Sequence, residues 1–407
     1  MRQDHGFQDS SPGTAQRVAP CQNRSESPAA AYTGNLRPWT RPSAAVQGHS
    51  EHPPQTAVKR GRGALSNATP RFESEIRCHE ADGWDIAEEL PPLRTEVTRE
   101  PAKSIITKNN SPDISFERSI NPYRGCEHGC VYCYARPTHA FLGLSPGLDF
   151  ETKLFAKTNA ALLLERELSA PGYDPKTIAM GTNTDPYQPV ERNERVMRQV
   201  LEVLARTNHP VTITTKSALV LRDLDLLAPM AEKGLAKVAI SVTTLDPALA
   251  RKMEPRAASP ARRLETLRQL AEAKIPAAVM VAPVIPAIND AEIETILARA
   301  KEMGAAEASY ILLRLPLEVA AIFAEWLQAH FPERCKRVLS LMQSTREGKL
   351  YYSRFGERMT GSGAYALMIK RRFEAAAARL GFAQRGAPLR CDLFQPLACP
   401  SEQLQLF

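Results

Sequence analysis

Three cysteines stand close together in one short polar stretch. Cys126, Cys130 and Cys133 lie in Gly-Cys-Glu-His-Gly-Cys-Val-Tyr-Cys-Tyr, residues 125–134. This C-x3-C-x2-C spacing offers three thiolates to a metal. A zinc ion with three protein ligands would bind water in its fourth position, whereas a four-iron cluster held by three cysteines leaves one iron without a protein ligand. The sequence therefore predicts a metal centre with one position open to a small molecule.

A structural zinc site and three buried, unligated thiols are the alternative explanations. Structural zinc sites usually close with a fourth Cys or His at regular spacing. His128 lies inside the cysteine stretch and His139 follows it by six residues. Neither position suits a tetrahedral shell, so three iron ligands fit the pattern better.

This spacing, with Tyr132 directly before the third cysteine, resembles the signature of the radical S-adenosylmethionine (SAM) superfamily. The resemblance implies a [4Fe–4S] cluster whose free iron binds the amino and carboxylate groups of SAM. It also implies that the reduced cluster cleaves SAM to a 5′-deoxyadenosyl radical, which abstracts hydrogen from a substrate. A reductase, flavodoxin or ferredoxin would then serve as the electron donor. A non-catalytic iron–sulfur protein, either a redox sensor or a DNA-clamp-associated binding protein, is the alternative function.

The composition is that of an ordinary globular chain. Its 407 residues are 43% apolar and 24% charged, enough for one large domain with appendages or for two domains. No run reaches the length of a membrane span, and the polar N-terminus lacks an apolar secretory segment. We therefore expect a cytoplasmic protein without membrane contact. Eight cysteines in that compartment favour metal ligation over disulfides.

The charge balance is basic. A net charge of +7 and a pI near 9.0 are compatible with nucleic-acid binding but do not require it. The basic stretches, such as Lys370-Arg-Arg372, are not interleaved with aromatic residues as single-strand-binding grooves are. Solvated helix faces explain most of the excess.

Composition and pattern divide the chain into successive stretches. Residues 1–60 hold few large apolar side chains, so we expect a disordered tail that precedes everything resembling the family. The following stretches are a segment wrapping the main domain (61–117), a domain of βα repeats (118–332), a helical extension (333–384) and a flexible tail (385–407).

The βα repeats are predicted from β-branched runs that alternate with helix-like stretches, a pattern typical of a parallel sheet. Apolar residues recur at helical spacing over Val196–Leu204 and Ile293–Ala300. Asp246-Pro247, Ser259-Pro260 and Asn289–Glu292 look like helix starts, the last close to a capping box. The expected strands are Ser119–Tyr123, Thr177–Thr182, Val211–Lys216, Lys237–Thr244, Ala277–Pro283 and Ser309–Leu315. Six such units resemble the partial (βα)6, TIM-like barrel of radical SAM enzymes.

Polar residues follow several of these strands at their carboxyl ends, where α/β folds bind ligands. The loop after the second strand lies where the superfamily contacts the SAM amino group, and Lys216 matches a lysine that pairs with the SAM carboxylate in related lyases. A hydrogen-bonded turn, an exposed lysine and the β-propensity of threonine are the plain alternatives. The candidate SAM contacts are Tyr132, Thr182, Asn183, Thr184, Asp185, Lys216, Ser241, Thr243 and Arg256.

Three longer motifs indicate one particular group within the superfamily. Ser119–Cys126, Gly181–Pro189 and Val281–Pro286 are similar to a bacterial group related to spore photoproduct lyase, which repairs a thymine dimer in DNA. The lyase carries a hydrogen-donor cysteine at the end of its second strand, where this chain has Gly181-Thr182. Thymine-dimer reversal by the same steps is therefore not expected. Another lesion, a nucleotide or an RNA base is the expected substrate, and the sequence assigns no catalytic residue.

The last five residues of the sequence offer a separate indication, of a protein partner. Gln403-Leu-Gln-Leu-Phe407 resembles the peptide with which bacterial polymerases and repair proteins bind the sliding clamp, departing at its third residue. An extended tail would place Leu404, Leu406 and Phe407 in an apolar pocket. Attachment of the same residues to the chain's own domain is the alternative. Clamp binding would make DNA the substrate.

Overall fold

The computed structural model describes residues 61–73, 93–383 and 386–397, all within the unit spanning residues 56–407. The tail predicted to be disordered (1–60) and the clamp-like peptide (403–407) lie outside this part of the chain. None of the helices in it is long and apolar enough to cross a membrane.

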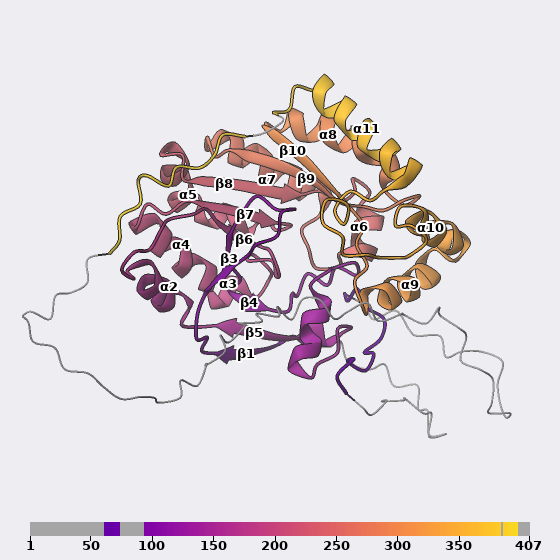
Figure 1. Cartoon of the computed structure of the whole chain (residues 1–407), viewed down its shortest axis with the longest axis horizontal. Helices are drawn as coiled ribbons and strands as arrows, with labels where there is room; N and C mark the ends of the chain where they lie inside the picture. The colour runs from indigo at the N-terminus through magenta and orange to yellow at the C-terminus, as the bar shows by residue number, and fades with distance from the viewer. Residues whose placement is uncertain (1–60, 74–92, 384–385, 398–407) are drawn as a thin grey trace, which may run out of the picture. The chain divides into compact units, whose positions relative to one another are not determined.

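The largest sheet has seven strands in the order β10–β9–β8–β7–β6–β3–β2. Its first six strands in this order are parallel, and β2 pairs antiparallel with β3. The predicted parallel α/β architecture is confirmed, with β10 at one edge (Figure 1) and β2 at the other. The strands are β2 (Ile106–Lys108), β3 (Arg118–Ile120), β6 (Ile178–Met180), β7 (Val211–Thr215), β8 (Ala236–Ser241), β9 (Ala277–Val284) and β10 (Glu307–Leu312).

Helices connect these strands and pack against the sheet. Asp246 and Ser259 accept backbone N–H hydrogen bonds at the starts of α6 and α7, as predicted, each followed by proline. α5, α7 and α8 contact β8 and β9 (Figure 1). The helices are η1 (Arg136–Leu142), α1 (Asp149–Thr152), α2 (Ala160–Leu168), α3 (Glu191–Glu194), α4 (Val196–Arg206), η2 (Ala218–Asp223), α5 (Leu224–Glu232), α6 (Pro247–Met253), α7 (Pro260–Glu272), η3 (Asp290–Glu292) and α8 (Ile293–Glu302).

Several local predictions were wrong. The strand predicted over Lys237–Thr244 ends at Ser241, and the one predicted over Ser309–Leu315 runs from Glu307 to Leu312. The first strand of the sheet ends at Ile120, because Asn121 turns away to bond residues 182–183 and Pro122 has no N–H for the ladder. Asn289 does not cap a helix: its amide donates to the carbonyls of residues 243 and 283 and its oxygen accepts from residue 285. Glu292 likewise bonds the loop after β8 rather than closing a capping box.

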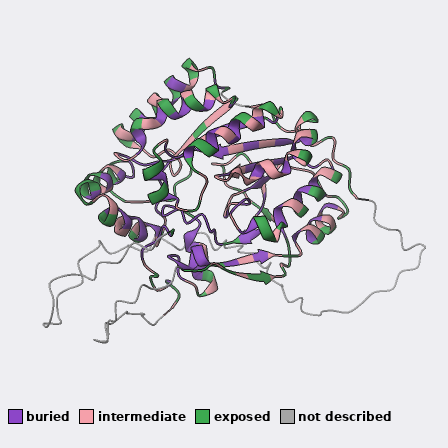
Figure 2. Ribbon diagram, turned by 180° about the vertical axis from the view of Figure 1, so that it is seen from behind, coloured by how far each residue is buried: buried purple, intermediate pink, exposed green. Residues whose placement is uncertain are grey.

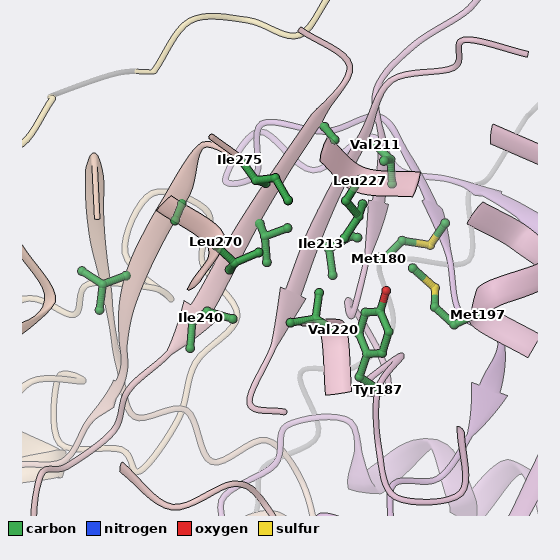
Figure 3. Packing of buried hydrophobic residues seen from close by; sticks show 14 of the residues in the cluster. Met180, Tyr187, Met197, Val211, Ile213, Val220, Leu227, Ile240, Leu270 and Ile275 are labelled. Atoms are coloured by element: carbon green, nitrogen blue, oxygen red, sulfur yellow. The ribbon is translucent and has the colours of Figure 1, made fainter. Parts of the chain in front are cut away.

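The main core lies between the sheet and its helices. Met180, Ile213 and Ile240 from the strands face Met197, Leu227 and Leu270 from the helices (Figure 3). Each such side chain contributes about 1.5–3 kcal/mol on leaving water. Figure 2 shows exposed residues on the outward faces of the helices and buried ones along the strands. This core fixes the strand ends that carry the loops described below.

A smaller sheet joins the N-terminal segment to the cysteine stretch. β1 (Glu96–Glu100) pairs in parallel with β5 (Lys153–Lys157), which pairs antiparallel with β4 (Tyr123–Arg124). Because β4 ends two residues before Cys126, this sheet fixes the start of the cysteine loop.

The C-terminal region is helical, as predicted. α9 (Val319–His330), α10 (Pro332–Ser344) and α11 (Gly363–Arg379) follow the last strand. α11 lies along α8 and β10 (Figure 1). A second apolar cluster connects α9 and α10 with the cysteine loop through Trp326, Phe323 and Val131.

Candidate metal centre and active site

The cysteine loop folds into successive tight turns. The N–H of Gly129 donates to Cys126 O at 3.3 Å, and that of Cys133 to Cys130 O at 3.2 Å. The loop is also held from outside, since Val131 N donates to Met253 O at 3.0 Å. Met253 ends the helix that follows β8, so the loop lies at the carboxyl end of the sheet, as predicted.

The three thiols interact electrostatically, with Cys126 and Cys130 buried and Cys133 half-buried. Burial raises the pKa of Cys126 well above its usual value, and nearby Asp185 and the other two thiols add to the effect. Burial raises the pKa of Cys130 to about 12 even though Lys216 opposes the shift. The pKa of Cys133 is raised in the same way. Without a metal the thiols are therefore neutral, and metal binding must release their protons.

This donor set fits an iron–sulfur cluster better than a single ion. Within the described residues, no three His, Cys, Asp or Glu side chains are arranged to hold one metal ion. Each thiolate of a four-iron cluster binds its own iron, so its cysteines do not converge on one point. Cationic Lys216 and Arg136 act on Cys133 and favour thiolates there. Cys126, Cys130 and Cys133 would hold the cluster.

A buried ion pair that sequence reasoning missed supports the loop. Arg136 donates to Cys130 O at 3.0 Å and to Gly147 O at 2.8 Å, and its guanidinium also bonds the carboxylate of Glu151. Both side chains are fully buried. Glu151 in turn accepts the N–H groups of Gly63 and Ala64 at 2.9 and 2.8 Å. Nothing in the sequence marks Glu151, whereas Gly63 stands where the family resemblance begins.

Gly63 packs tightly against the backbone of the cysteine loop. A Cβ atom at this position would lie 1.8 Å from the carbonyl oxygen of Gly129, between the first two cysteines. Arg62 beside it donates to Glu151 O at 2.9 Å. The N-terminal segment therefore does more than wrap the domain, because it packs directly on the predicted metal centre.

Asp185 links the loop after β6 to the cysteine loop and to β7. Its carboxylate accepts from Thr215 Oγ1 at 2.6 Å and from Lys216 N at 2.8 Å, and it pairs with His128 Nδ1 at 3.3 Å. Burial alone would raise the pKa of Asp185, but His128 and these hydrogen bonds outweigh it and lower the pKa to about 2. The carboxylate is thus charged and occupied by protein partners.

Tyr132 and Thr243 meet at a second buried carboxylate, Glu254. The hydroxyls of both donate to Glu254, and Arg263 bonds its other oxygen. Burial would raise the pKa of Glu254, but Arg263 and then Lys216 lower it. Sequence reasoning named Arg256 and overlooked Glu254 two residues before it; a short Met-Glu-Pro-Arg motif was the available signal.

Lys216 approaches the same group. Its ammonium lies 5.7 Å from the centroid of the Tyr132 ring and acts electrostatically on Cys130 and Cys133. Its side chain forms no hydrogen bond or ion pair with any of the described residues. The structure therefore brings Tyr132, Thr243 and Lys216 together beside the thiols, with a cation available for an anionic ligand.

The remaining candidate SAM contacts form hydrogen bonds with other parts of the protein. Thr184 donates to Gly125 O at 2.6 Å and Ser241 to Ala282 O at 2.9 Å. Thr182 and Asn183 are held by Asn121, through the hydroxyl and the backbone N–H respectively. Arg256 bonds Glu127 Oε1 at 2.7 Å and lines a cavity beside the cysteine loop. The hydroxyls of Thr184 and Ser241 therefore donate to backbone carbonyls of the protein itself.

An arginine–tyrosine group lies near the end of the cysteine loop. Arg314, which follows β10, places its guanidinium 5.0 Å from the Tyr134 ring centroid and 5.9 Å from that of Tyr351. Its Nε is buried without a hydrogen-bond partner among the described residues. Tyr134 follows the last cysteine and donates to Thr182 O, yet 44% of it is exposed. No pattern in the sequence indicated this group, because its members are far apart along the chain.

The family follows from comparison with known proteins. The model of the radical SAM superfamily matches residues 120–300, which include all three cysteines and most of the sheet. The chain belongs to the radical SAM superfamily. It is a radical SAM enzyme whose reaction the match does not specify.

Curated relatives share the domain but add no substrate. An uncharacterized protein of Mycobacterium tuberculosis is 37% identical over 242 residues, 59% of this chain and 71% of that protein. An uncharacterized protein of Methanocaldococcus jannaschii is 26% identical over 240 residues, 59% of this chain and 85% of that protein.

Solved structures of spore photoproduct lyase share the fold. The lyase complexed with dinucleoside spore photoproduct has a TM-score of 0.51 and 16% identity, over 70% of this chain and 80% of that one. A lyase variant with bound AdoMet and the same dinucleoside has a TM-score of 0.50 and 15% identity. At this identity the likeness concerns the fold alone.

Proposed function

We propose that this radical SAM enzyme holds a [4Fe–4S] cluster through Cys126, Cys130 and Cys133, cleaves SAM reductively, and acts on nucleic acid or a nucleotide. The observation that carries the proposal is the gathering of two buried thiols, Cys126 and Cys130, and the half-buried Cys133 near Lys216, whose ammonium makes no hydrogen bond or ion pair within the described chain. When bound, the cluster and SAM supply reductive cleavage of the sulfonium, recovered as 5′-deoxyadenosine.

The chain's own residues bind and orient these groups. The Lys216 ammonium is available to pair with the SAM carboxylate, and Glu254 fixes Tyr132 beside it. Asn183 offers a side-chain amide at the same strand ends. Apolar walls from Val131 and Ile285 exclude water from this side of the loop. Asp185 keeps the loops after β6 and β7 in register.

The Arg314 group supports a nucleic-acid or nucleotide substrate. Nucleobases stack on aromatic rings and on guanidinium planes. Two aromatic rings, those of Tyr134 and Tyr351, and the guanidinium plane of Arg314 are available here. Both ring centroids lie within 6 Å of the guanidinium. Tyr134 directly follows the last cysteine. The basic net charge of +7 and the resemblance to a DNA-repair lyase agree with this choice.

The step that returns a hydrogen atom to the product radical must differ from that of spore photoproduct lyase. Gly181 and Thr182 stand where the lyase has its donor thiol, and Gly181 cannot be replaced by cysteine without collision, since its Cβ would lie 2.1 Å from Thr214 O. Cys335 is buried in α10 within the apolar cluster of α9 and α10. We therefore expect a reaction other than thymine-dimer reversal by the same steps.

Two protein partners complete the proposal. The cluster requires a one-electron donor, for which a flavodoxin, a ferredoxin or their reductase is suited. The peptide Gln403–Phe407, outside the described residues, would tether the enzyme to a DNA sliding clamp.

The experiment is 5′-deoxyadenosine release from anaerobically reconstituted, dithionite-reduced protein given SAM. Three parallel reactions contain no DNA, unirradiated DNA and UV-irradiated DNA. Stimulation by irradiated DNA alone would support a DNA lesion as substrate. Release that neither DNA stimulates would exclude DNA as the substrate, and absence of release would favour a redox sensor.

A further inference from the structure

A cavity opens beside the cysteine loop, and neither Tyr132 nor Glu254 is among its lining residues. Its volume is about 350 Å³, and its walls come from the loops that follow β6, β7 and β8 together with His128 of the cysteine loop. This size lies at the lower end of the range of small-ligand sites. His128 is two residues from both Cys126 and Cys130, so a ligand here would adjoin the predicted metal centre.

The cavity is lined by positive charge. Arg192, Arg256 and Arg262 contribute to its wall, and no Asp or Glu does. Arg256 is bonded to Glu127. The guanidiniums of Arg192 and Arg262 make no ion pair or hydrogen bond with the described part of the chain. Nearby Arg222, by contrast, is bonded to two buried carboxylates.

The charge arrangement selects an anion with several oxygens. Guanidinium groups bind phosphate through parallel N–H donors, which a single chloride or a carbonyl group does not match. α7 (Pro260–Glu272) begins at the rim, where Arg262 and the preceding Ala258 line the wall. The positive end of its helix dipole adds to the attraction for an anion. Ser217 also lines the cavity, and its hydroxyl, which accepts from Leu219 N, retains its own proton for donation.

We propose that this cavity binds a phosphate group of the substrate. The inference rests on the proposed function, because it identifies where a nucleic acid or nucleotide is anchored while its base reaches the reactive centre. Two sources share this chemistry: a phosphodiester of single-stranded nucleic acid and the phosphate of a free nucleotide. Arg192 and Arg262 are the binding residues, and Arg256 assists while Glu127 holds it in place.

The test compares two double variants of the reconstituted full-length protein. Arg192→Gln with Arg262→Gln removes both unpaired guanidiniums of the cavity. Arg334→Gln with Arg371→Gln removes the same charge from exposed positions on α10 and α11. Thermal unfolding and iron content, measured first, check that both variants fold and load alike.

Binding is measured with two probes. Fluorescence anisotropy follows a labelled single-stranded 20-nucleotide thymidylate, and calorimetry follows thymidine monophosphate. We expect the cavity variant to weaken one probe by at least roughly tenfold relative to the control, as loss of charge-assisted hydrogen bonds predicts. For the oligonucleotide, the salt dependence of log K should also fall by about 0.7 for each phosphate that the variant no longer neutralises.

Each outcome decides the matter. Weakened oligonucleotide binding assigns the cavity to a phosphodiester, and weakened monophosphate binding alone assigns it to a free nucleotide. Wild-type binding that both variants retain equally overturns the cavity assignment but leaves the proposed function standing. Wild-type protein that binds neither probe overturns the phosphate site, while SAM cleavage is judged separately by 5′-deoxyadenosine release.

Discussion

Replacing Glu151 by glutamine should destabilise the cysteine loop. Glu151 and Arg136 are fully buried, and Arg136 also bonds Cys130 O and Gly147 O. Glutamine has the same shape but no charge. The guanidinium would therefore stay in the interior without its counterion, while Gly63 N and Ala64 N would share a single acceptor oxygen.

The expected cost is large. Removing one partner of a buried ion pair typically costs about 3–5 kcal/mol. For a domain of this size, that corresponds to a fall in the Tm of the metal-free protein of roughly 5–10 °C. Because the pair holds the backbone between Cys130 and the N-terminal segment, we also expect iron content clearly below four per chain after reconstitution.

The assay is thermal unfolding of the metal-free protein together with iron and sulfide analysis after reconstitution. Glu202→Gln is the matched control, since it removes the same group from an exposed pair with Arg198 on α4, where the expected cost is about 0.5 kcal/mol. If Glu151→Gln matched this control in Tm and iron content, the assigned role of the ion pair would be refuted.

Three further predictions concern other parts of the chain. Gly63→Ala should cost about 1–3 kcal/mol and lower iron content, because its Cβ would meet Gly129 O; normal loading would contradict the close packing. Burial lowers the pKa of His209 to about 4 from 6.5, so the unfolded chain takes up the proton first. Unfolding free energy of the metal-free protein in urea should therefore fall as pH decreases from 6.5 toward 4, by up to a few kcal/mol, and His209→Gln should flatten this dependence. Deleting residues 403–407 should abolish sliding-clamp pull-down and preserve SAM cleavage; no pull-down by the intact protein would exclude the tether.

Much of the fold was predictable because local signals agree with it. Continuous apolar strands such as Ala277–Val284 and the proline-marked helix starts after Asp246 and Ser259 report directly on neighbouring residues. The wrong boundary at Ile120 and the missing cap at Asn289 have one cause. Both depend on side chains that bond loops from other strands, which local patterns do not encode.

The candidate site was predictable to the extent that its residues are adjacent in sequence. The cysteines stand in one loop, whereas Glu151 reaches Gly63 across 88 residues and Tyr132 reaches Glu254 across 122. Such contacts arise only when the sheet brings its loops together. Thr184 is a polar residue at a predicted strand end, yet its hydroxyl donates to the backbone carbonyl of Gly125. Residue type and place in the sequence alone therefore do not distinguish a polar residue that stabilises a loop from one that binds a ligand.

Three cysteines are proposed to hold the centre at which SAM is cleaved. The most direct test of this claim is 5′-deoxyadenosine release by anaerobically reconstituted, reduced wild-type protein and by Cys126→Ala, with folding of both confirmed by circular dichroism. We predict release by the wild type, and from Cys126→Ala neither release nor a four-iron content. Equal release by the two proteins, or none by a wild type that carries four irons, would contradict the claim.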